Sequence, residues 1–140
     1  MKRLILTDRL LAMAFVLSAA TGIALHIAGH GDNHEAWHAW AVGHVATSLG
    51  FLIAGGFHVY MHLGWYKGLL HRSPGRRSPV TAALTVVFLC VVSTGMILLG
   101  TEGANSPVGL WHYRIGLLLA AISIGHMVKR RRPLFKRIKR

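Results

Sequence analysis

The 140-residue chain has very few acidic residues and a single cysteine. Its acidic side chains are Asp8, Asp32, Glu35 and Glu102. None of them lies in the middle of an apolar stretch, and the sequence contains no hydrolytic or phosphoryl-transfer constellation. Cys90 stands alone, which excludes an internal disulfide, a cysteine-rich metal cluster and a Cys-x-x-Cys-His motif.

Charged residues of either sign are also scarce, at 14% of the chain, whereas 53% is hydrophobic and the mean hydropathy is +0.46. This is more apolar surface than a soluble domain of this size can bury, so the composition indicates an integral membrane protein. Four largely uncharged runs reach the roughly 20 residues that a spanning helix needs. We predict an all-α fold, one domain over residues 1–140, with transmembrane helices at about 8–30, 36–68, 78–101 and 108–129.

The basic residues lie almost entirely on one side of these predicted helices. Fifteen of the sixteen lie on that side, and the exception is Arg114, which is near the outer end of the last predicted helix. The positive-inside rule assigns the basic side to the cytoplasm, which predicts cytoplasmic termini (N-in, C-in) in a multi-pass protein of a bacterial inner membrane. The other fifteen are Lys2, Arg3 and Arg9, then Lys67, Arg72, Arg76 and Arg77, and eight residues from Lys129 to Arg140.

The net charge of +12 would also fit a nucleic-acid-binding protein. In so hydrophobic a chain, however, topology and attraction to anionic lipid head groups explain the charge. The sequence contains no recognisable nucleic-acid motif. We therefore expect membrane lipid as a partner and no nucleic acid.

Two pairs of histidines are the most informative feature that the sequence does contain. His44 and His58 lie 14 residues apart in one predicted span, and His112 and His126 lie 14 apart in another. In an α-helix this spacing puts both members of a pair on one side, about 21 Å apart along the axis. Such a pattern can hold two haems stacked across a bilayer, and hydrogen bonding between helices or a proton path is the alternative for intramembrane histidines.

The depths of these histidines then predict how they pair. Both spans run from outside to inside, so His44 and His112 lie near the outer leaflet, and His58 and His126 lie further in. One histidine from each helix at each level gives two bis-imidazole sites, suited to six-coordinate haem iron. Without a Cys-x-x-Cys-His motif, the two haems would be b-type and held by coordination and packing. The fold expected is a four-helix bundle of two helix hairpins.

Further candidates have more than one interpretation. His62, one turn after His58, could bond an inner haem propionate, replace His58 as ligand, or be an interfacial histidine. Arg114 could pair with an outer haem propionate or extend to the lipid head groups. Four more histidines around the outer loop could bind a transition metal or a third haem, take protons from a quinol, or be simply solvated. These four are His26, His30, His34 and His38.

Several short motifs resemble a known group of proteins. They are the runs His38-Ala-Trp-Ala-Val-Gly-His44, His58-Val-Tyr-Met-His62-Leu-Gly-Trp65 and Thr21-Gly22-Ile-Ala-Leu-His26, and His126 followed by a basic tail. Together they resemble the four-helix flavinylation-associated cytochrome family, and they are also similar to the cytochrome b subunits of membrane formate dehydrogenases and hydrogenases. The resemblance implies a dihaem membrane cytochrome that exchanges electrons between the quinone pool and an extracytoplasmic redox partner, a flavoprotein or cytochrome.

Three functions are consistent with the sequence. The first is the dihaem electron conduit, with quinone as a further ligand and the redox chemistry supplied by the cofactor. The second is a haem-bearing membrane anchor subunit of a larger oxidoreductase complex. The third is a haem-free metal or proton transporter.

Overall fold

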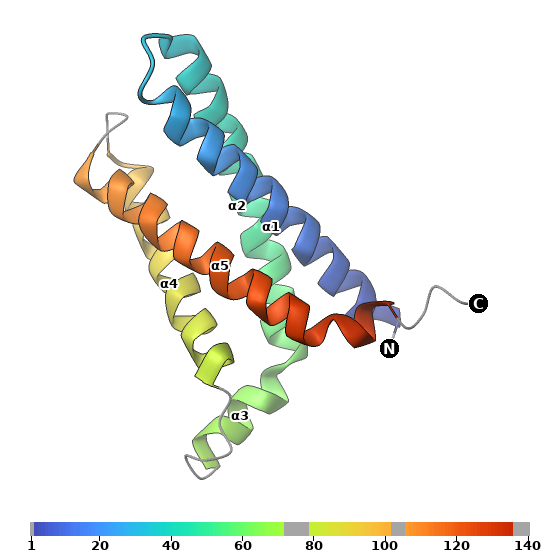
Figure 1. Cartoon of the computed structure of the whole chain (residues 1–140). Helices are drawn as coiled ribbons and strands as arrows, with labels where there is room; N and C mark the ends of the chain where they lie inside the picture. The colour runs from blue at the N-terminus through green and yellow to red at the C-terminus, as the bar shows by residue number, and fades with distance from the viewer. Residues whose placement is uncertain (1, 72–78, 102–105, 136–140) are drawn as a thin grey trace. The chain divides into compact units, whose positions relative to one another are not determined.

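The computed structural model describes residues 2–71, 79–101 and 106–135, and all regular secondary structure in this part of the chain is helical. Four helices are long and apolar enough to cross a membrane, which confirms the prediction of an all-helical chain with four such helices. Arg72, Arg76, Arg77, Glu102 and the last five residues lie outside the described residues. The helices are α1 (Lys2–Ala28), α2 (His34–Met61), α3 (Leu63–His71), α4 (Pro79–Leu98) and α5 (Pro107–Phe135) (Figure 1).

Local sequence explains where two of the long helices begin. Asn33 is the N-cap of α2, and its side chain accepts a hydrogen bond of 3.0 Å from the backbone N–H of Ala36. At the start of α5, the Ser106 hydroxyl accepts from the backbone N–H of Gly109 at 3.1 Å, and Pro107 takes the first helical position. Such caps satisfy backbone donors that have no partner within the helix.

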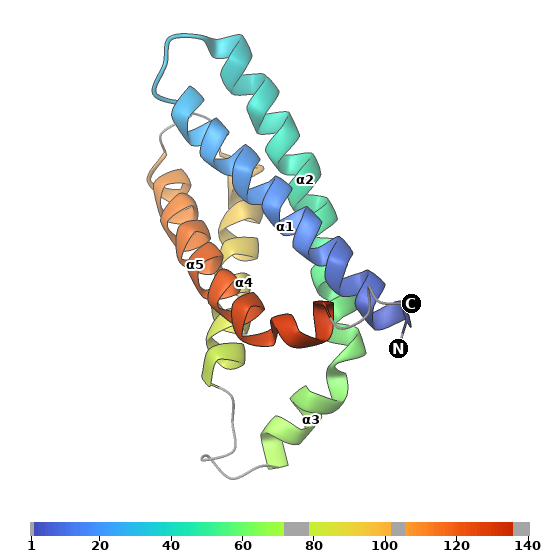
Figure 2. The same cartoon turned by 45° about the vertical axis from the view of Figure 1, so that its right-hand side comes forward.

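The second helix ends earlier than the sequence predicts. The span expected to reach residue 68 stops at Met61, with His62 as its C-cap, and α3 then runs in a different direction (Figure 2). The His62 backbone N–H donates both to the His58 carbonyl at 3.2 Å and to the Val59 carbonyl at 3.0 Å. A shared donor of this kind marks the tightened last turn of a helix. The break is a local backbone event that no proline signals.

The chain divides into two compact units, Met1–Arg77 and Ser78–Arg140. In the first unit, α1 and α2 lie side by side and run antiparallel, as both views show (Figures 1 and 2). Small hydroxyl side chains pack between them, with Ser18 bonded to Ser48 and Thr21 bonded to Thr47, both at 2.9 Å. Small and weakly polar contacts of this kind are typical of helices that associate in lipid, where apolar burial gives no advantage.

In the second unit, α4 packs against α5. Their association brings Thr94 and Gly95 of α4 against His112 of α5. Threonine hydroxyls along α4 donate back to carbonyls of the preceding turn, as Thr94 does to Cys90 at 2.8 Å and Thr85 does to Thr81 at 2.9 Å. These bonds satisfy polar groups within the helix, which a membrane-spanning segment requires.

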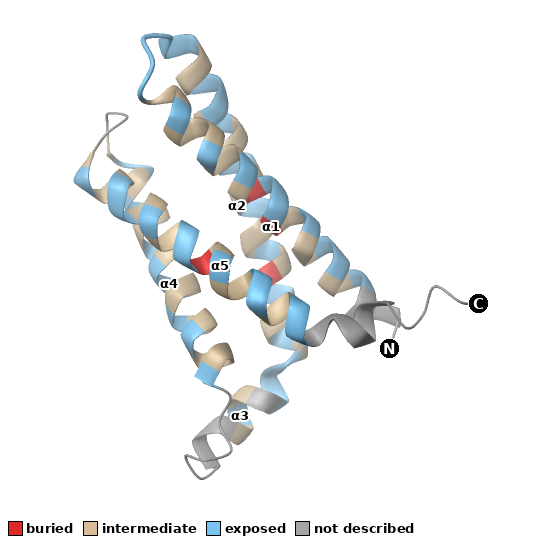
Figure 3. Ribbon diagram, in the orientation of Figure 1, coloured by how far each residue is buried: buried red, intermediate tan, exposed pale blue. Residues whose placement is uncertain are grey.

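Most side chains of both units are exposed or only half-buried (Figure 3). Among the described residues, Phe15 and Leu119 are the buried hydrophobic side chains, whereas large apolar side chains along all four long helices are exposed. Exposed apolar surface on this scale is unfavourable in water and is the normal state of helices in lipid. The chain therefore has the character of a multi-pass membrane protein.

Candidate functional site

His44 of α2 packs directly against α1. Its Nδ1 lies 3.1 Å from the Ser18 backbone carbonyl oxygen and 3.3 Å from the Thr21 hydroxyl. A carbonyl oxygen can only accept a hydrogen bond, so the bond to Ser18 requires the proton of the neutral imidazole to be on Nδ1. The lone pair is then on Nε2, which lies 3.5 Å from the Ser48 hydroxyl and is the nitrogen that could hold a metal.

Gly22 leaves the space that the His44 ring occupies. A Cβ atom at this position would lie 2.9 Å from His44 Cε1 and 3.2 Å from Nδ1. Real Cβ atoms do not approach ring atoms this closely, so any larger residue would force the imidazole or the helix to shift. Thr21 and Gly22 therefore act together, because the threonine contacts Nδ1 and the glycine accommodates the ring.

His112 of α5 is held in the same way by α4. The Thr94 hydroxyl lies 2.9 Å from His112 Nδ1 and donates its own proton to the Cys90 or Val91 carbonyl. Because its single proton is used within α4, the hydroxyl accepts from His112, which again puts the imidazole proton on Nδ1. A Cβ at Gly95 would lie 3.2 Å from His112 Cε1. The structure thus repeats one Thr-Gly and histidine arrangement in both units.

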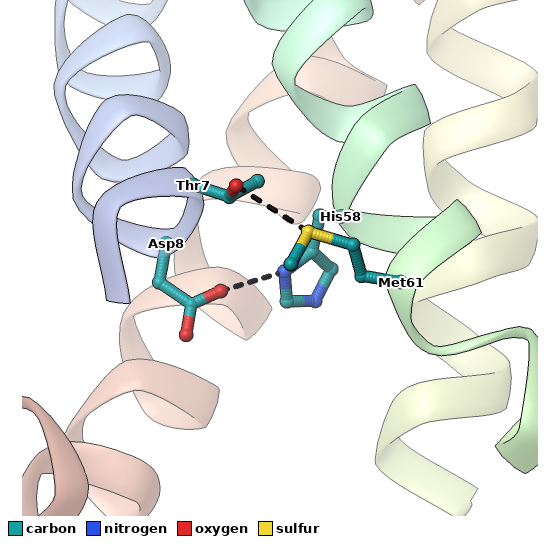
Figure 4. Close-up of polar contacts among 4 residues, drawn as sticks. All are labelled: Thr7, Asp8, His58 and Met61. Carbon is teal, nitrogen blue, oxygen red and sulfur yellow. Dashed lines mark hydrogen bonds and ion pairs between the residues drawn. The ribbon is translucent and has the colours of Figure 1, made fainter. Parts of the chain in front are cut away.

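His58, the inner histidine of α2, has a different partner. Its Nδ1 donates to the Asp8 carboxylate at 2.9 Å, and the two side chains are 34% and 35% exposed (Figure 4). Beside this pair, the Thr7 hydroxyl contacts the Met61 sulfur at 3.4 Å, so α1 and α2 remain in contact at this level. A carboxylate that accepts from Nδ1 fixes the ring and raises the basicity of the other nitrogen, as it does behind many metal-bound histidines.

His62 lies beside this pair at the end of α2. The rings of His58 and His62 are 4.7 Å apart between centroids. Asp8, His58 and His62 each offer a ligand atom, and the three atoms all lie within 4.8 Å of one another. Among the described residues these three form the group of acidic or histidine side chains compact enough to hold a metal ion. His62 is exposed, so the group is open on one side.

The other predicted site residues of the second unit are on α5. His126 is half-buried there, four helical turns after His112. Arg114 is exposed, and its guanidinium lies 5.6 Å from the centroid of the Trp111 ring. This cation–π contact places Arg114 beside an aromatic side chain near the beginning of α5.

The four histidines around the first loop do not gather into one cluster. His26 and His30 contact each other edge to face, with centroids 4.7 Å apart, and His30 Nδ1 bonds to the His26 carbonyl at 2.8 Å. His34 instead stacks on Trp37 with centroids 5.4 Å apart. Within the described part of the chain, His26, His30, His34 and His38 do not form a compact group of three metal-binding side chains.

The sequence alone did not identify Asp8 as a partner of His58, nor Thr21 and Thr94 as partners of the outer histidines. One signal was present, because a Thr-Gly pair occurs in the first and third predicted spans, at Thr21-Gly22 and Thr94-Gly95. Its role depends on which residues of the neighbouring helix it faces. Asp8 gave no periodic signal of its own.

Comparison with models of known protein families gives no match, and no similar protein was found among curated sequences or solved structures.

Proposed function

We propose that this chain is a dihaem b-type membrane cytochrome that carries electrons across the bilayer between the quinone pool and an extracytoplasmic redox partner. One observation carries the proposal. Three of the four spaced histidines have Nδ1 bonded to an oxygen of the neighbouring helix, from Ser18 or Thr21, from Thr94 and from Asp8. This arrangement fixes the ring and leaves the lone pair on Nε2, the nitrogen that would hold haem iron.

In this proposal the two units associate as a four-helix bundle of two helix hairpins. His44 and His112 bind one iron near the outer leaflet, and His58 and His126 bind a second iron further in. The levels are about 21 Å apart at the helical rise, so a histidine of one level cannot reach the iron of the other. A bound haem supplies one-electron transfer, and the protein positions the ligands and excludes water.

The orientation follows from the basic residues of the sequence. Both termini lie in the cytoplasm of a bacterial inner membrane, and the short loops that contain Asp32 and Glu102 face outward. The outer haem is then the one nearest to the redox partner, a flavoprotein or cytochrome. Arg114 is available for a propionate at the outer level, and His62 for one at the inner level. A haem-bearing anchor subunit of a larger oxidoreductase would use the same sites.

A haem-free transporter of metal ions or protons is the second candidate, and a specific observation favours it. Asp8, His58 and His62 bring one carboxylate and two imidazoles within 4.8 Å of one another near the inner end of α2. Imidazole and carboxylate are suitable ligands for several divalent transition metals. In that case His58 would bind the ion together with its neighbours and would not serve as an axial haem ligand.

An absorption spectrum of the protein purified from membranes separates these candidates. The proposal predicts reduced b-haem bands and two haems per chain by pyridine haemochrome analysis, with both haems lost in a variant lacking all four spaced histidines. A protein without haem that instead contains one transition-metal ion per chain, lost in His62→Ala, would contradict the cytochrome and support the transporter.

A further inference from the structure

We infer that Asp8 is a positioning residue that lowers the reduction potential of the inner haem, an inference that rests on the proposed function. Asp8 lies near the beginning of α1, within the segment Leu6–Ala28 that is long and apolar enough to span a membrane. A carboxylate in such a segment is costly unless it has a partner. Its partner here is His58 Nδ1, at 2.9 Å across the two helices.

The chemistry of this contact differs from that of the outer histidines. His44 and His112 direct Nδ1 to neutral acceptors, a backbone carbonyl and threonine hydroxyls. His58 directs Nδ1 to a carboxylate. Charge-assisted hydrogen bonds are shorter and about twice as strong as neutral ones, so the His58 ring acquires more anionic character than the outer imidazoles do.

An anionic ligand environment favours oxidised iron over reduced iron. Oxidised haem iron carries one more positive charge, and a more basic Nε2 stabilises that charge through the bond, while the carboxylate stabilises it through space. The two side chains are 34% and 35% exposed, so the electrostatic part is partly screened, whereas the part transmitted through the bond is not. Hydrogen bonding and charge around the ligand are among the means by which a protein sets the potential of a haem.

Helix α4 of the second unit has no equivalent carboxylate. Asp8 lies thirteen residues before Thr21, and Thr81 lies thirteen residues before Thr94. The corresponding position on α4 is therefore a neutral hydroxyl, and α4 contains no acidic residue at all (Pro79–Leu98). Asp8 therefore occurs in only one of the two units, and it acts on one ligand of one haem. It cannot be explained as part of the arrangement that the two units share.

A redox titration followed by absorption tests this role on the full chain in lipid nanodiscs. Asp8→Asn removes the charge and keeps a hydrogen-bonding group of similar size. We expect it to raise the reduction potential of one haem by at least about 59 mV, which for one electron corresponds to a tenfold change in the equilibrium between oxidised and reduced haem. The other haem should keep its potential. Asp32→Asn is the matched control, because it makes the same chemical change at an exposed outer position.

The shifted haem is assigned with histidine variants. The effect of Asp8→Asn should persist in a His44→Ala background, which retains only the inner haem, and should vanish in a His58→Ala background. If Asp8→Asn shifted neither haem, shifted both equally, or acted no more strongly than Asp32→Asn, the inference would be wrong.

Asp8→Asn could lose the inner haem altogether, and its potential could then not be measured. In that case Asp8→Glu, which keeps the negative charge, shows whether the missing charge is the cause. Retention of the haem in Asp8→Glu, with a potential shifted by less than a twofold change in equilibrium, supports the role of the carboxylate, and loss in both variants contradicts it. The wild-type spectrum separates this test from the proposed function. A wild-type chain with no haem overturns the function itself, whereas two haems with no effect of Asp8 overturns only the inference.

Discussion

The two units of this chain are alike around His44 and His112, and they differ at Asp8, whose corresponding residue in the second unit is Thr81. In both, a threonine oxygen contacts the imidazole Nδ1 and the following glycine leaves room for the ring, at Thr21-Gly22 and at Thr94-Gly95. The inner histidine of the first unit has a carboxylate partner, whereas the second unit has Thr81 at the position that corresponds to Asp8. In the proposed cytochrome, the shared arrangement would position a haem ligand in each unit, and the difference would give one of the inner ligands a distinct chemical character.

The surroundings of the shared arrangement support this interpretation. The first unit also has Ser18 bonded to Ser48, and Thr21 bonded to Thr47, between its helices. The residues at the positions corresponding to Ser18, Thr47 and Ser48 are Val91, Ile115 and Gly116, which have no hydroxyl. If the Thr-Gly pair served only helix packing, the hydroxyls beside it would be expected to recur as well. The pair recurs without them, which points to the histidine as the reason for it.

The comparison requires both units to enter the membrane in the same direction. A reporter that is active only outside the cytoplasm should give no signal when fused after Arg140, and a strong signal when inserted after Gly31 in the first outer loop. The reason is the excess of basic residues on the side of the termini. A strong signal from the C-terminal fusion would place the second unit in the opposite orientation and would break the matching of histidine levels.

Filling the space beside the outer histidines should be the next largest effect. Gly22→Ala brings a methyl group to 2.9 Å from the His44 ring, and Gly95→Ala brings one to 3.2 Å from the His112 ring. We expect each to displace its histidine at a cost of about 1–3 kcal/mol, larger for Gly22. The measurement is the fraction of outer haem in the low-spin state. An unfolding experiment is less suitable, because alanine favours a helix over glycine by about 1 kcal/mol and this gain would partly offset the cost of the steric contact.

Gly56→Ala is the control for these glycine variants. A Cβ at Gly56 meets nothing within 4 Å, so the outer haem should be unaffected. Equal loss of low-spin haem in all three variants would show that the close contacts with the histidine rings are not what matters.

Removing the threonine hydroxyls should have a smaller effect that differs between the units. Thr94→Val removes an acceptor 2.9 Å from His112 Nδ1, at a cost of about 0.5–1.5 kcal/mol. Thr21→Val removes a more distant contact, 3.3 Å from His44 Nδ1, and leaves the Ser18 carbonyl at 3.1 Å as acceptor. The affinity of the outer site for haem, measured by titration of the apoprotein, should therefore fall more for Thr94→Val. A larger loss for Thr21→Val would contradict the assigned acceptors.

Much of the fold follows from the sequence because composition and charge determine it directly. Four long apolar segments in a chain with few charges have no stable alternative to membrane-spanning helices, so their number was predictable. The end of α2 at Met61 was not, because it depends on a shared backbone hydrogen bond at His62 rather than on a proline or a strong stop signal.

The histidines were predictable as candidates, whereas their partners were not. Spacing along one helix can be counted in the sequence, but the contact between Asp8 and His58 joins residues 50 positions apart. It depends on the register of α1 against α2, which close packing of small residues sets. The same holds for Thr21 and His44, 23 positions apart. Sequence periodicity contains no information on that register, so the oxygen acceptors of these histidines could be found only in the structure.

The measurement that tests the central claim most directly is a ligand-pairing cycle, read from the low-spin haem signals of single and double histidine variants. We predict that His58→Ala and His126→Ala each remove the same low-spin signal and leave the other, and that the double variant loses little more. His44→Ala and His112→Ala should together remove the remaining signal in the same way. A His58→Ala and His126→Ala pair that removed different haems, or left both signals intact, would contradict the account. It would point to His62, or to the loop histidines His26, His30, His34 and His38, as ligands instead.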